Sequence, residues 1–393
     1  MAGESIFFLP FVLARIFRPT VLQFYQISKL ELGQCFSIYG ITAVVSYFLG
    51  GPLADKYPNH KLIASGLWLT AFGGLVLTLF PSINLMYMMY GFWGFSTIML
   101  FWAPLHKTIR LFGGENYQGR SFGGVEAGRG LMAALLGTFS LVIFVVAENL
   151  GESTFSVIML STSIFIALVG ILAWIFIPNF KNVQSQKIQW KQAFTNSKFW
   201  ILAGIILCAY VGYKITDDYS LYAYEVLGFT ELEAAKIGSS ALWLRFLFAL
   251  IAGFLADRFK ASKVILLGFV SMILGGGLIS SGVLNSVGFT LLVLAFTLIG
   301  VYGIRGIYFA IMQEAAIPKN ATGLAIGIMS VIGYTPDVFM SPLMGYLLDN
   351  YQGETGHKLV FLVLVLFSLL GFTLAFRMLQ ISKLNQPKPL VNK

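Results

Sequence analysis

Long apolar runs alternate with short polar breaks along the whole chain. Dividing the chain at charged residues, prolines and glycine-rich breaks leaves twelve apolar segments. A helix needs about 20 apolar residues to cross the hydrocarbon core of a bilayer, and the segments are of that order. The pattern therefore predicts an all-α membrane protein with twelve transmembrane helices. The predicted spans are residues 6–27, 34–54, 62–81, 84–106, 121–147, 153–177, 197–222, 233–256, 262–283, 287–313, 321–348 and 357–380.

The longest polar stretch lies near the middle of the chain, over residues 178–196. It contains three lysines and several Gln and Asn residues, and six predicted spans lie on either side of it. We expect a linker here, between an N-terminal six-helix bundle (1–177) and a C-terminal six-helix bundle (197–380). A tail (381–393) follows the second bundle.

Composition agrees with a membrane protein and excludes other classes. The chain is 57% hydrophobic and 11% charged, with a mean hydropathy of +0.80, whereas a soluble domain is about 25% charged. So few charges cannot cover a soluble surface, which excludes most cytosolic enzymes and disordered scaffolds. The net charge of +9 is spread through the chain, so we expect no nucleic-acid partner. Cys35 and Cys208 lie in apolar runs, so neither a disulfide framework nor a cysteine metal site is expected.

The first apolar run is predicted to be a retained helix. The preceding residues Met1 to Ser5 carry Glu4 and no basic residue, and no small-residue cleavage site follows the run. A cleavable signal peptide needs both features, so we expect none here.

The basic residues predict the orientation of the spans. Cytoplasmic loops carry an excess of Lys and Arg. If both termini lie on one side, the loops and tail on that side hold 17 Lys or Arg, and the other side holds three, Lys29, Lys236 and Lys358. The asymmetry predicts that both termini, the linker and the tail are cytoplasmic.

Two segments about half a chain apart resemble each other. Residues 50–61 contain Gly-Pro-Leu-Ala-Asp-Lys-Tyr, and residues 252–263 contain Gly-Phe-Leu-Ala-Asp-Arg-Phe. Each follows the second predicted span of its half and is rich in basic residues. The repetition predicts two related halves, an arrangement that transporters use to build a central site.

These segments are similar to the conserved loop between spans two and three of the major facilitator superfamily, roughly Gly-x-Leu-x-Asp-[Arg/Lys]-x-Gly-[Arg/Lys]-[Arg/Lys]. Pro58 and Lys260 replace the second Gly of that motif. The resemblance covers the whole chain and extends to bacterial sugar-type and organic-anion facilitators. It implies two pseudo-symmetric six-helix bundles around a central cavity that opens to alternate sides.

The resemblance also implies a gate at the motif loops. In the family, the matching Asp of the first half caps the N-terminus of span eleven and pairs with a basic residue of span four. For this chain it implies that Asp55 pairs with Arg110, with Asp257 as the counterpart in the second half. The alternative is that Asp55 caps only its own helix end.

Charges inside the predicted spans are the candidate functional residues. A charge at the bilayer centre costs at least about 2.5–3.5 kcal/mol, so such residues are expected to face a cavity or a partner. The basic set is Arg15, Arg18, Arg129, Lys214, Arg245 and Arg305, and the acidic set is Glu126, Asp217, Asp218, Glu314 and Asp337.

Arg15 and Arg18 lie three residues apart and therefore on one helix face. Pro19 follows and can bend the helix. Because span one lines the cavity in the superfamily, we expect this pair to bind substrate or to belong to a gate. The alternative is a salt bridge to a carboxylate of another helix.

Glu126 and Arg129 have the same spacing and can pair with each other. We expect them to belong to a gate network with Arg110 or Arg120. Glu314, at the end of span ten, is expected to act likewise.

Span seven combines charges with tyrosines. We expect Lys214 and Asp218 to pair as i,i+4 neighbours and to bind substrate with Tyr210. Asp217 is a candidate for proton coupling. The alternative is that these residues form an aromatic belt at the outer interface.

In spans ten and eleven, Tyr302, Arg305 and Tyr334 are expected to bind substrate and Asp337 to carry a proton. The alternative is a static Arg305–Asp337 pair, for which Arg245 could compete. The near balance of basic and acidic residues argues against a cavity built only for a strong anion. It is compatible with a zwitterion, a weak organic anion or a neutral polar solute.

The sequence lacks a Gly-x-x-x-x-Gly-Lys-[Ser/Thr] nucleotide loop, and its three histidines, His60, His106 and His357, lie at or near loops without metal-ligand spacing. We therefore expect no enzyme activity, cofactor or metal. The predicted function is a secondary active transporter of the bacterial inner membrane, a monomer surrounded by lipid that moves a small polar solute with protons. The alternatives are an organic-anion exchanger and a transporter-like sensor.

Overall fold

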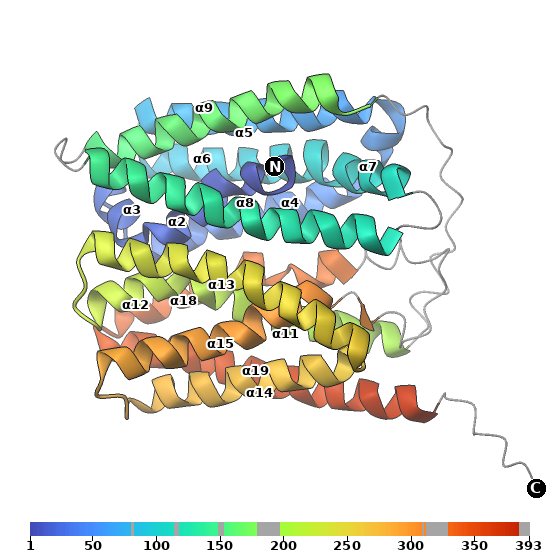
Figure 1. The fold of residues 1–393 in the computed structure, drawn as a ribbon. Helices are drawn as coiled ribbons and strands as arrows, with labels where there is room; N and C mark the ends of the chain where they lie inside the picture. Colours follow the sequence, from blue (N-terminus) through green and yellow to red (C-terminus); the bar gives the residue numbers. More distant parts are fainter. Residues whose placement is uncertain are drawn as a thin grey trace, which may run out of the picture.

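The computed structural model describes residues 1–79, 82–113, 118–147, 153–178, 197–308, 310–311 and 329–384. The helices lie roughly parallel, with the N-terminal half above the C-terminal half in Figure 1. The N-terminal half contains α1 (Ala2–Phe7), the π-helix η1 (Phe8–Val12), α2 (Leu13–Ile16), α3 (Arg18–Tyr25), α4 (Lys29–Lys56), α5 (Asn59–Leu79), α6 (Ile83–Gly94), the π-helix η2 (Phe95–Trp102), α7 (Ala103–Gly113), α8 (Gln118–Ala147) and α9 (Ser153–Phe176). The C-terminal half contains α11 (Ser197–Ile215), the 3₁₀ helix η4 (Thr216–Asp218), α12 (Tyr219–Glu225), α13 (Glu231–Arg258), α14 (Ala261–Ser281), α15 (Val287–Ile307), α18 (Pro336–Asn350) and α19 (Glu354–Leu384).

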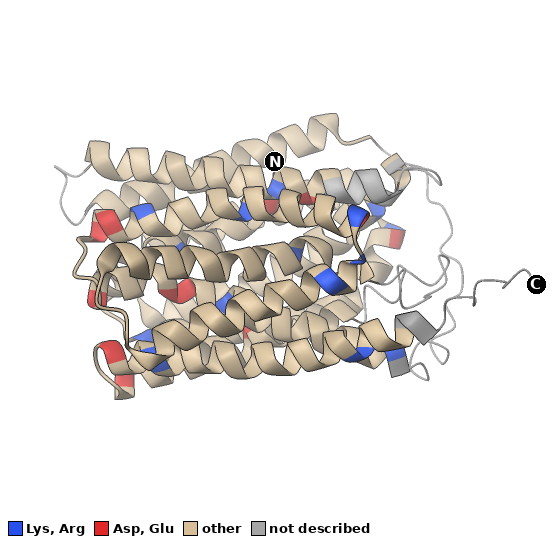
Figure 2. Cartoon of the chain, turned by 60° about the horizontal axis from the view of Figure 1, so that its bottom comes forward, with Lys and Arg blue, Asp and Glu red and all other residues tan. Residues whose placement is uncertain are grey.

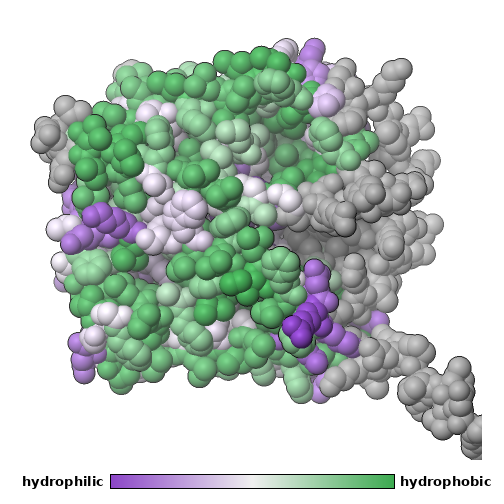
Figure 3. Space-filling model, in the orientation of Figure 1, coloured by the Kyte–Doolittle hydropathy of each residue, from purple (hydrophilic) through white to green (hydrophobic). Residues whose placement is uncertain are grey.

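The helices have the length and surface of membrane spans. Among the described residues, nine helices are long and apolar enough to cross a bilayer, and a bent pair would make ten. Their outer faces expose large apolar side chains such as Phe72, Phe176 and Phe254, and Figure 3 shows apolar residues over most of the visible side. Only backbone that is internally hydrogen-bonded is stable in lipid, so the all-helical structure confirms an all-α membrane protein.

The first predicted span is broken rather than continuous. The segments Ala2–Ile16 and Arg18–Tyr25 meet at an angle of 94°. The helix is already distorted by η1, Phe17 leaves the helical conformation (φ −107°, ψ 38°), and Pro19 occupies the first turn of α3. Proline and π-bulges are the usual causes of such kinks, and the sequence-based expectation of a bend near Pro19 is confirmed.

Other predicted spans differ at their ends. The fourth is divided into α6, η2 and α7, and the last extends to Leu384, into the predicted tail. The rest of the tail, most of the predicted linker and part of the eleventh predicted span lie outside the described residues.

The two halves repeat each other in register. α13 begins and ends 202 residues after α4 (29 to 231 and 56 to 258), and α14 follows α5 by the same interval (59 to 261 and 79 to 281). Both α4 and α13 begin with a capping box, in which Ser28 or Thr230 and a Glu three residues later satisfy each other's backbone N–H groups. The repeated motif seen in the sequence is thus part of a longer structural repeat.

Glycines bring the halves into close contact. α4 packs against α18, where a Cβ added at Gly33 or Gly40 would lie within 3 Å of the α18 backbone. Gly238 of α13 packs equally closely against Ile16. Small residues permit such backbone contact between membrane helices, so the seam between the halves is narrow on this side.

Candidate functional site

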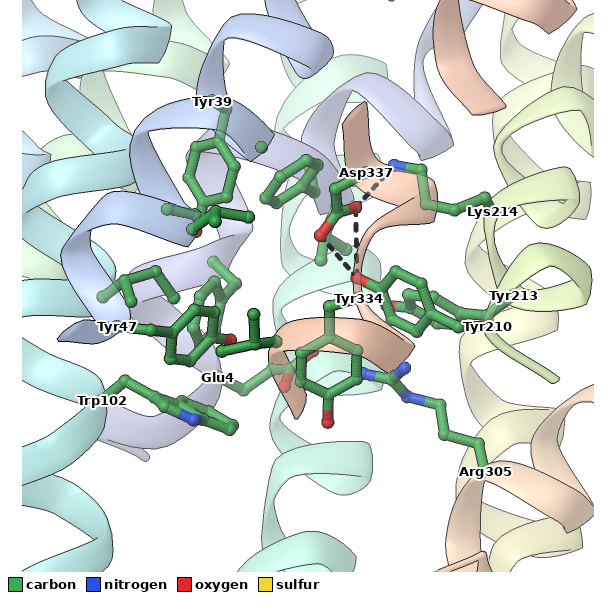
Figure 4. Close-up of a pocket in the computed structure, with 18 of the residues that line it drawn as sticks. Glu4, Tyr39, Tyr47, Trp102, Tyr210, Tyr213, Lys214, Arg305, Tyr334 and Asp337 are labelled. Atoms are coloured by element: carbon green, nitrogen blue, oxygen red, sulfur yellow. Dashed lines mark hydrogen bonds and ion pairs between the residues drawn. The ribbon is translucent and has the colours of Figure 1, made fainter. Parts of the chain in front are cut away.

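A cavity of about 70 Å³ lies between the two halves. It is enclosed by α1, η1, α2, α4, η2 and α8 of the first half and by α11, α15 and α18 of the second. Figure 4 shows polar side chains from both halves directed into it. Its charged and larger aromatic lining residues other than phenylalanine are Glu4, Arg15, Tyr39, Tyr47, Trp102, Arg129, Tyr210, Tyr213, Lys214, Arg305, Tyr334 and Asp337.

An ion pair crosses between the halves beside the cavity. Arg15 Nε donates to Asp217 Oδ1 at 2.6 Å, and both side chains are buried. Arg18 donates to the backbone carbonyl of Asp217 at 2.9 Å. Asp217 follows Arg15 by 202 positions, the interval of the structural repeat, so this pair joins equivalent positions of the two halves. The salt bridge to another helix, left open from the sequence, is the arrangement found.

Lys214 connects this pair to a second carboxylate. Its Nζ lies 3.0 Å from Asp217 Oδ2 and 3.5 Å from Asp337 Oδ1. The Tyr210 hydroxyl donates to both Asp337 oxygens at 3.2 and 3.0 Å, as the dashed lines in Figure 4 show. Asp337 is therefore held by Lys214 and Tyr210, and the expected alternative of a static Arg305–Asp337 pair is wrong.

The expected pair of Lys214 and Asp218 is also wrong. The helix tightens to a 3₁₀ turn at Thr216–Asp218, and in such a turn residues three apart align along the axis. Asp217 rather than Asp218 therefore faces Lys214. Asp218 lies 2.7 Å from His357 Nδ1 instead.

Glu4, which the sequence reading left outside the membrane, is buried between two arginines. Its carboxylate lies 3.0 Å from Arg129 Nε and 2.7 Å from Arg245 Nη1. Arg129 also bonds Glu126 at 2.6 Å, so the predicted Glu126–Arg129 pair is confirmed. Arg129 and Arg245, two arginines inside predicted spans, each require a carboxylate partner. The sequence alone could not show that this partner is Glu4, near the N-terminus.

Tyr213 is surrounded by guanidinium groups. The Cζ atoms of Arg305, Arg15 and Arg245 lie 3.7, 4.3 and 5.9 Å from the centre of its ring. A cation over a tyrosine face is attracted by the ring quadrupole. Arg305 forms no ion pair with any carboxylate among the described residues, and its Nη1 is buried without a hydrogen-bond partner.

At one end of the molecule, ion pairs and hydrogen bonds connect the two halves and close the space between them. We call this end the distal end, defined by the turns at 26–28, 226–230 and 351–353. Lys29 Nζ lies 2.8 Å from Glu225, which lies 3.1 Å from His357 Nε2. Asp349 accepts from the backbone N–H of Leu30 at 2.8 Å. His357, expected near a loop, is thus buried within this network.

Comparison with known proteins decides the family. The profile of the Major Facilitator Superfamily matches residues 2–336. This chain belongs to the major facilitator superfamily. It is accordingly a membrane transporter and not an enzyme.

Relatives of this facilitator cover nearly the whole chain. The inner membrane proteins YqcE and YihN of Escherichia coli are 26% and 23% identical to it, each over 94% of this chain and 90% or 91% of their own. The glycerol-3-phosphate transporter of Bacillus subtilis is 21% identical over 85% of this chain and 82% of its own.

Solved structures share its fold. A bacterial homologue of the human lysosomal transporter Spinster, in an inward-facing and unoccupied conformation, has a TM-score of 0.75 at 13% identity and covers 99% of this chain and 97% of its own. A D-xylose–proton symporter has a TM-score of 0.74 at 14% identity, over 96% of this chain and 95% of its own.

The opposite end of this facilitator, the motif end, carries the repeated loops. The Asp55 carboxylate lies 2.8 Å from Lys107 Nζ on α7. Lys107 is one turn before Arg110, the expected partner, whose side chain lies outside the described part. Asp257 is exposed at the end of α13, and Glu314 is outside the described residues.

The cavity brings together only part of the predicted site. Arg15, Tyr210, Lys214, Arg305, Tyr334 and Asp337 line it, whereas Arg18, Asp217, Asp218 and Tyr302 do not. Asp217 and Asp218 are buried and paired with Arg15 and His357, so they do not belong to an exposed aromatic belt. Among the described residues, no group of three or more His, Cys, Asp or Glu is arranged to hold a metal ion.

Proposed function

We propose that this facilitator is a secondary active transporter that moves a small polar organic solute by alternating access, coupled to protons. The observation that carries the proposal is the cavity between the halves, which is lined by charges from both while the distal end is closed by bonds between them. A rigid-body movement of one half against the other would open the distal end and close the opposite end around such a cavity.

In the proposed architecture, twelve spans form two six-helix bundles, 1–177 and 197–380, joined by a linker at 178–196. Both termini and the tail (381–393) are cytoplasmic, in a bacterial inner membrane. The support is the distribution of 17 basic residues on one side against three on the other, and the inner-membrane names of the two Escherichia coli relatives. The distal end then faces outward.

The proposed gates are the bonds that a change of state must break. At the distal end these are the Lys29–Glu225 and Leu30–Asp349 bonds. At the motif end, Asp55 with Lys107 and Arg110 is the proposed counterpart, with Asp257 and Glu314 in the second half. Glu126 and Arg129 couple this end to the cavity through Glu4.

Asp337 is the proposed proton carrier. It lies between Lys214 and Tyr210 at the wall of the cavity, so protonation would release Lys214 to Asp217 alone. Such a change in pairing alters contacts between α18 and α11, and a few kcal/mol of differential interaction is enough to shift a population between states. Asp217, which pairs with Arg15, is the second proposed residue for proton coupling.

The test is uptake into proteoliposomes with and without an inward proton gradient. The panel comprises sugars, sugar acids, amino acids and nucleosides. We expect one class to accumulate only with the gradient and to be released by a protonophore. Flux that ignores the gradient would contradict proton coupling, and exchange of internal for external solute would indicate an exchanger. A solute that binds but never accumulates would indicate a sensor.

A further inference from the structure

Arg305 faces the cavity and forms no ion pair with a carboxylate in the part of the chain that the structure describes. Of the cavity-lining cations in the described structure, Arg15 pairs with Asp217, Lys214 with Asp217 and Asp337, and Arg129 with Glu4. Arg305 rests instead on tyrosine rings, 3.7 Å from the centre of Tyr213. Arg305 is partly buried, and charges in a protein interior are normally paired, so the arrangement has one positive charge available.

The residues around the cavity also carry an excess of positive charge. Four cations and two carboxylates line it in the described structure. Adding the direct ion-pair partners Asp217, Glu126 and Arg245 gives five cations against four carboxylates, and Arg18 adds to the positive side. With Arg18 the count is six cations against four carboxylates, compared with six against five in the set expected from the sequence. Glu4 is gained, but Asp218 is bonded to His357 at the distal end and Glu314 lies outside the described residues.

Two guanidinium nitrogens provide donors for an anion. Among the described residues, Arg305 Nη1 and Arg15 Nη1 are both buried without a hydrogen-bond partner, and both arginines line the cavity. Their Cζ atoms lie 3.7 and 4.3 Å from the Tyr213 ring centre, so they are at most 8.0 Å apart (3.7 plus 4.3). Each of these nitrogens can donate to an anionic group in the cavity, at about 2.8 Å per bond.

The position of Arg305 is fixed by its helix. Gly306 lies beside it on α15, and a Cβ added there would be 3.1 Å from the Ala249 backbone of α13. α15 therefore packs closely against α13, with Arg305 in its last turn directed toward the cavity (Figure 4).

From these observations we infer that the transported solute carries an anionic group, a carboxylate or a phosphate, and that Arg305 binds it beside Tyr213. The inference rests on the proposed function and specifies its substrate class. The nearby Tyr334 hydroxyl, which shares a hydrogen bond with Tyr308 at 2.9 Å, is placed to contact the neutral part of the same solute. Arginine suits this role because its planar fork matches both anions.

The test uses two matched series that differ only in the anionic group. One is glycerol, glycerate and glycerol 3-phosphate, and the other is glucose, gluconate and glucose 6-phosphate. Binding to the purified full-length protein is measured by calorimetry and thermal shift. We expect an anionic member to bind the wild type and its neutral counterpart to bind at least about tenfold more weakly, since a hydrogen bond to a charged group contributes about 1.5–3 kcal/mol.

Variants separate a binding role from a structural one. Arg305→Gln should lower affinity for the anionic member about tenfold or more and bring it near that of the neutral one, whereas Arg305→Lys should restore part of the difference. Arg377→Gln, which removes an exposed arginine of α19, should change nothing. Elution volume and unliganded melting temperature check that each variant is folded.

The inference is overturned if no anionic member binds, if neutral members bind as tightly, or if Arg305→Gln weakens both members equally. Proteoliposome uptake of the same compounds separates the two proposals. Transport of a neutral solute alone would contradict the anion site but support the transport function. An anion that binds through Arg305 but is never transported would support the anion-binding site and contradict the transport function.

Discussion

At the scale of single residues, Glu4 illustrates why the charges of this protein are tolerated inside a membrane. It is almost completely buried and contacts both Arg129 and Arg245. A buried charge whose partner is removed stays in a medium that cannot solvate it. One carboxylate therefore makes two buried arginines acceptable, and through them it connects α1 to α8 and α13.

Replacing Glu4 by Gln should strongly destabilise the protein. Breaking a buried ion pair from one side costs about 3–5 kcal/mol, so we expect a melting temperature lower by several degrees in detergent. The matched control is Glu354→Gln, because Glu354 is half-exposed in a helix-surface pair with Lys358 and such pairs contribute little. Equal shifts for the two variants would contradict the assignment.

Asp337→Asn tests the proposed proton carrier at the same scale. The amide keeps the size of the side chain but cannot be charged, so Lys214 should keep only Asp217 as its partner. We expect gradient-driven accumulation to be lost while exchange of labelled for unlabelled solute continues. Glu233→Gln, a change within a capping box where Gln is also accepted, should retain accumulation. Loss of both activities in Asp337→Asn would point to a structural role.

At the scale of helices, α4 and α18 pack closely against each other toward the distal end. Gly33 and Gly40 of α4, and Gly345 of α18, sit where the two backbones meet. The Lys29–Glu225 pair and the Asp349 bond to Leu30 lie at the same end. The glycines set the distance between helices, and the polar bonds hold them there.

Gly345→Val should therefore favour the state in which the distal end is open. A Cβ at this position would lie 2.5 Å from Leu30 Cα, and overpacking of this kind costs about 1–3 kcal/mol. The measure is the labelling rate of a cysteine placed at Val44, in the cavity wall, by a reagent added from the distal side. We expect it to rise several-fold.

The matched control for this change is Gly277→Val on α14. An added Cβ at Gly277 meets no atom within 4 Å, so the labelling rate should stay at the wild-type value. An unchanged rate in Gly345→Val as well would show that this seam does not limit distal opening.

At the scale of the whole molecule, the proposed orientation in the bilayer rests on the distribution of charge. Figure 2 shows charged residues at both ends of the helices and a few at mid-depth, with long uncharged stretches between them. The few buried charges are mostly paired with one another inside the protein. The orientation should therefore follow the basic residues at the helix ends.

Cysteine labelling tests that orientation across a single helix. Lys236 and Lys263 are both exposed and lie near opposite ends of α13. In a background without Cys35 and Cys208, Lys236→Cys should react with an impermeant maleimide in intact cells, and Lys263→Cys only after permeabilisation. The reverse pattern would place the termini outside.

Much of the architecture follows from the sequence, because membrane spans are a local property. Apolar length, the bend at Pro19 and the repeated loop were all visible in the chain, and so was the short set of charges that the interior must accommodate. Hydrophobic burial and backbone satisfaction act on each segment separately, so these features do not depend on which helices become neighbours.

The pairing of the charges was decided only by the tertiary structure. Glu4 meets Arg129 across 125 residues and Arg15 meets Asp217 across 202, and no spacing rule links positions so far apart. A single 3₁₀ turn redirected Asp218 to His357. In the described part of the chain the same packing left Arg305 among tyrosines without an ion-pair partner, because which cation stays unpaired depends on how helices distant in sequence meet.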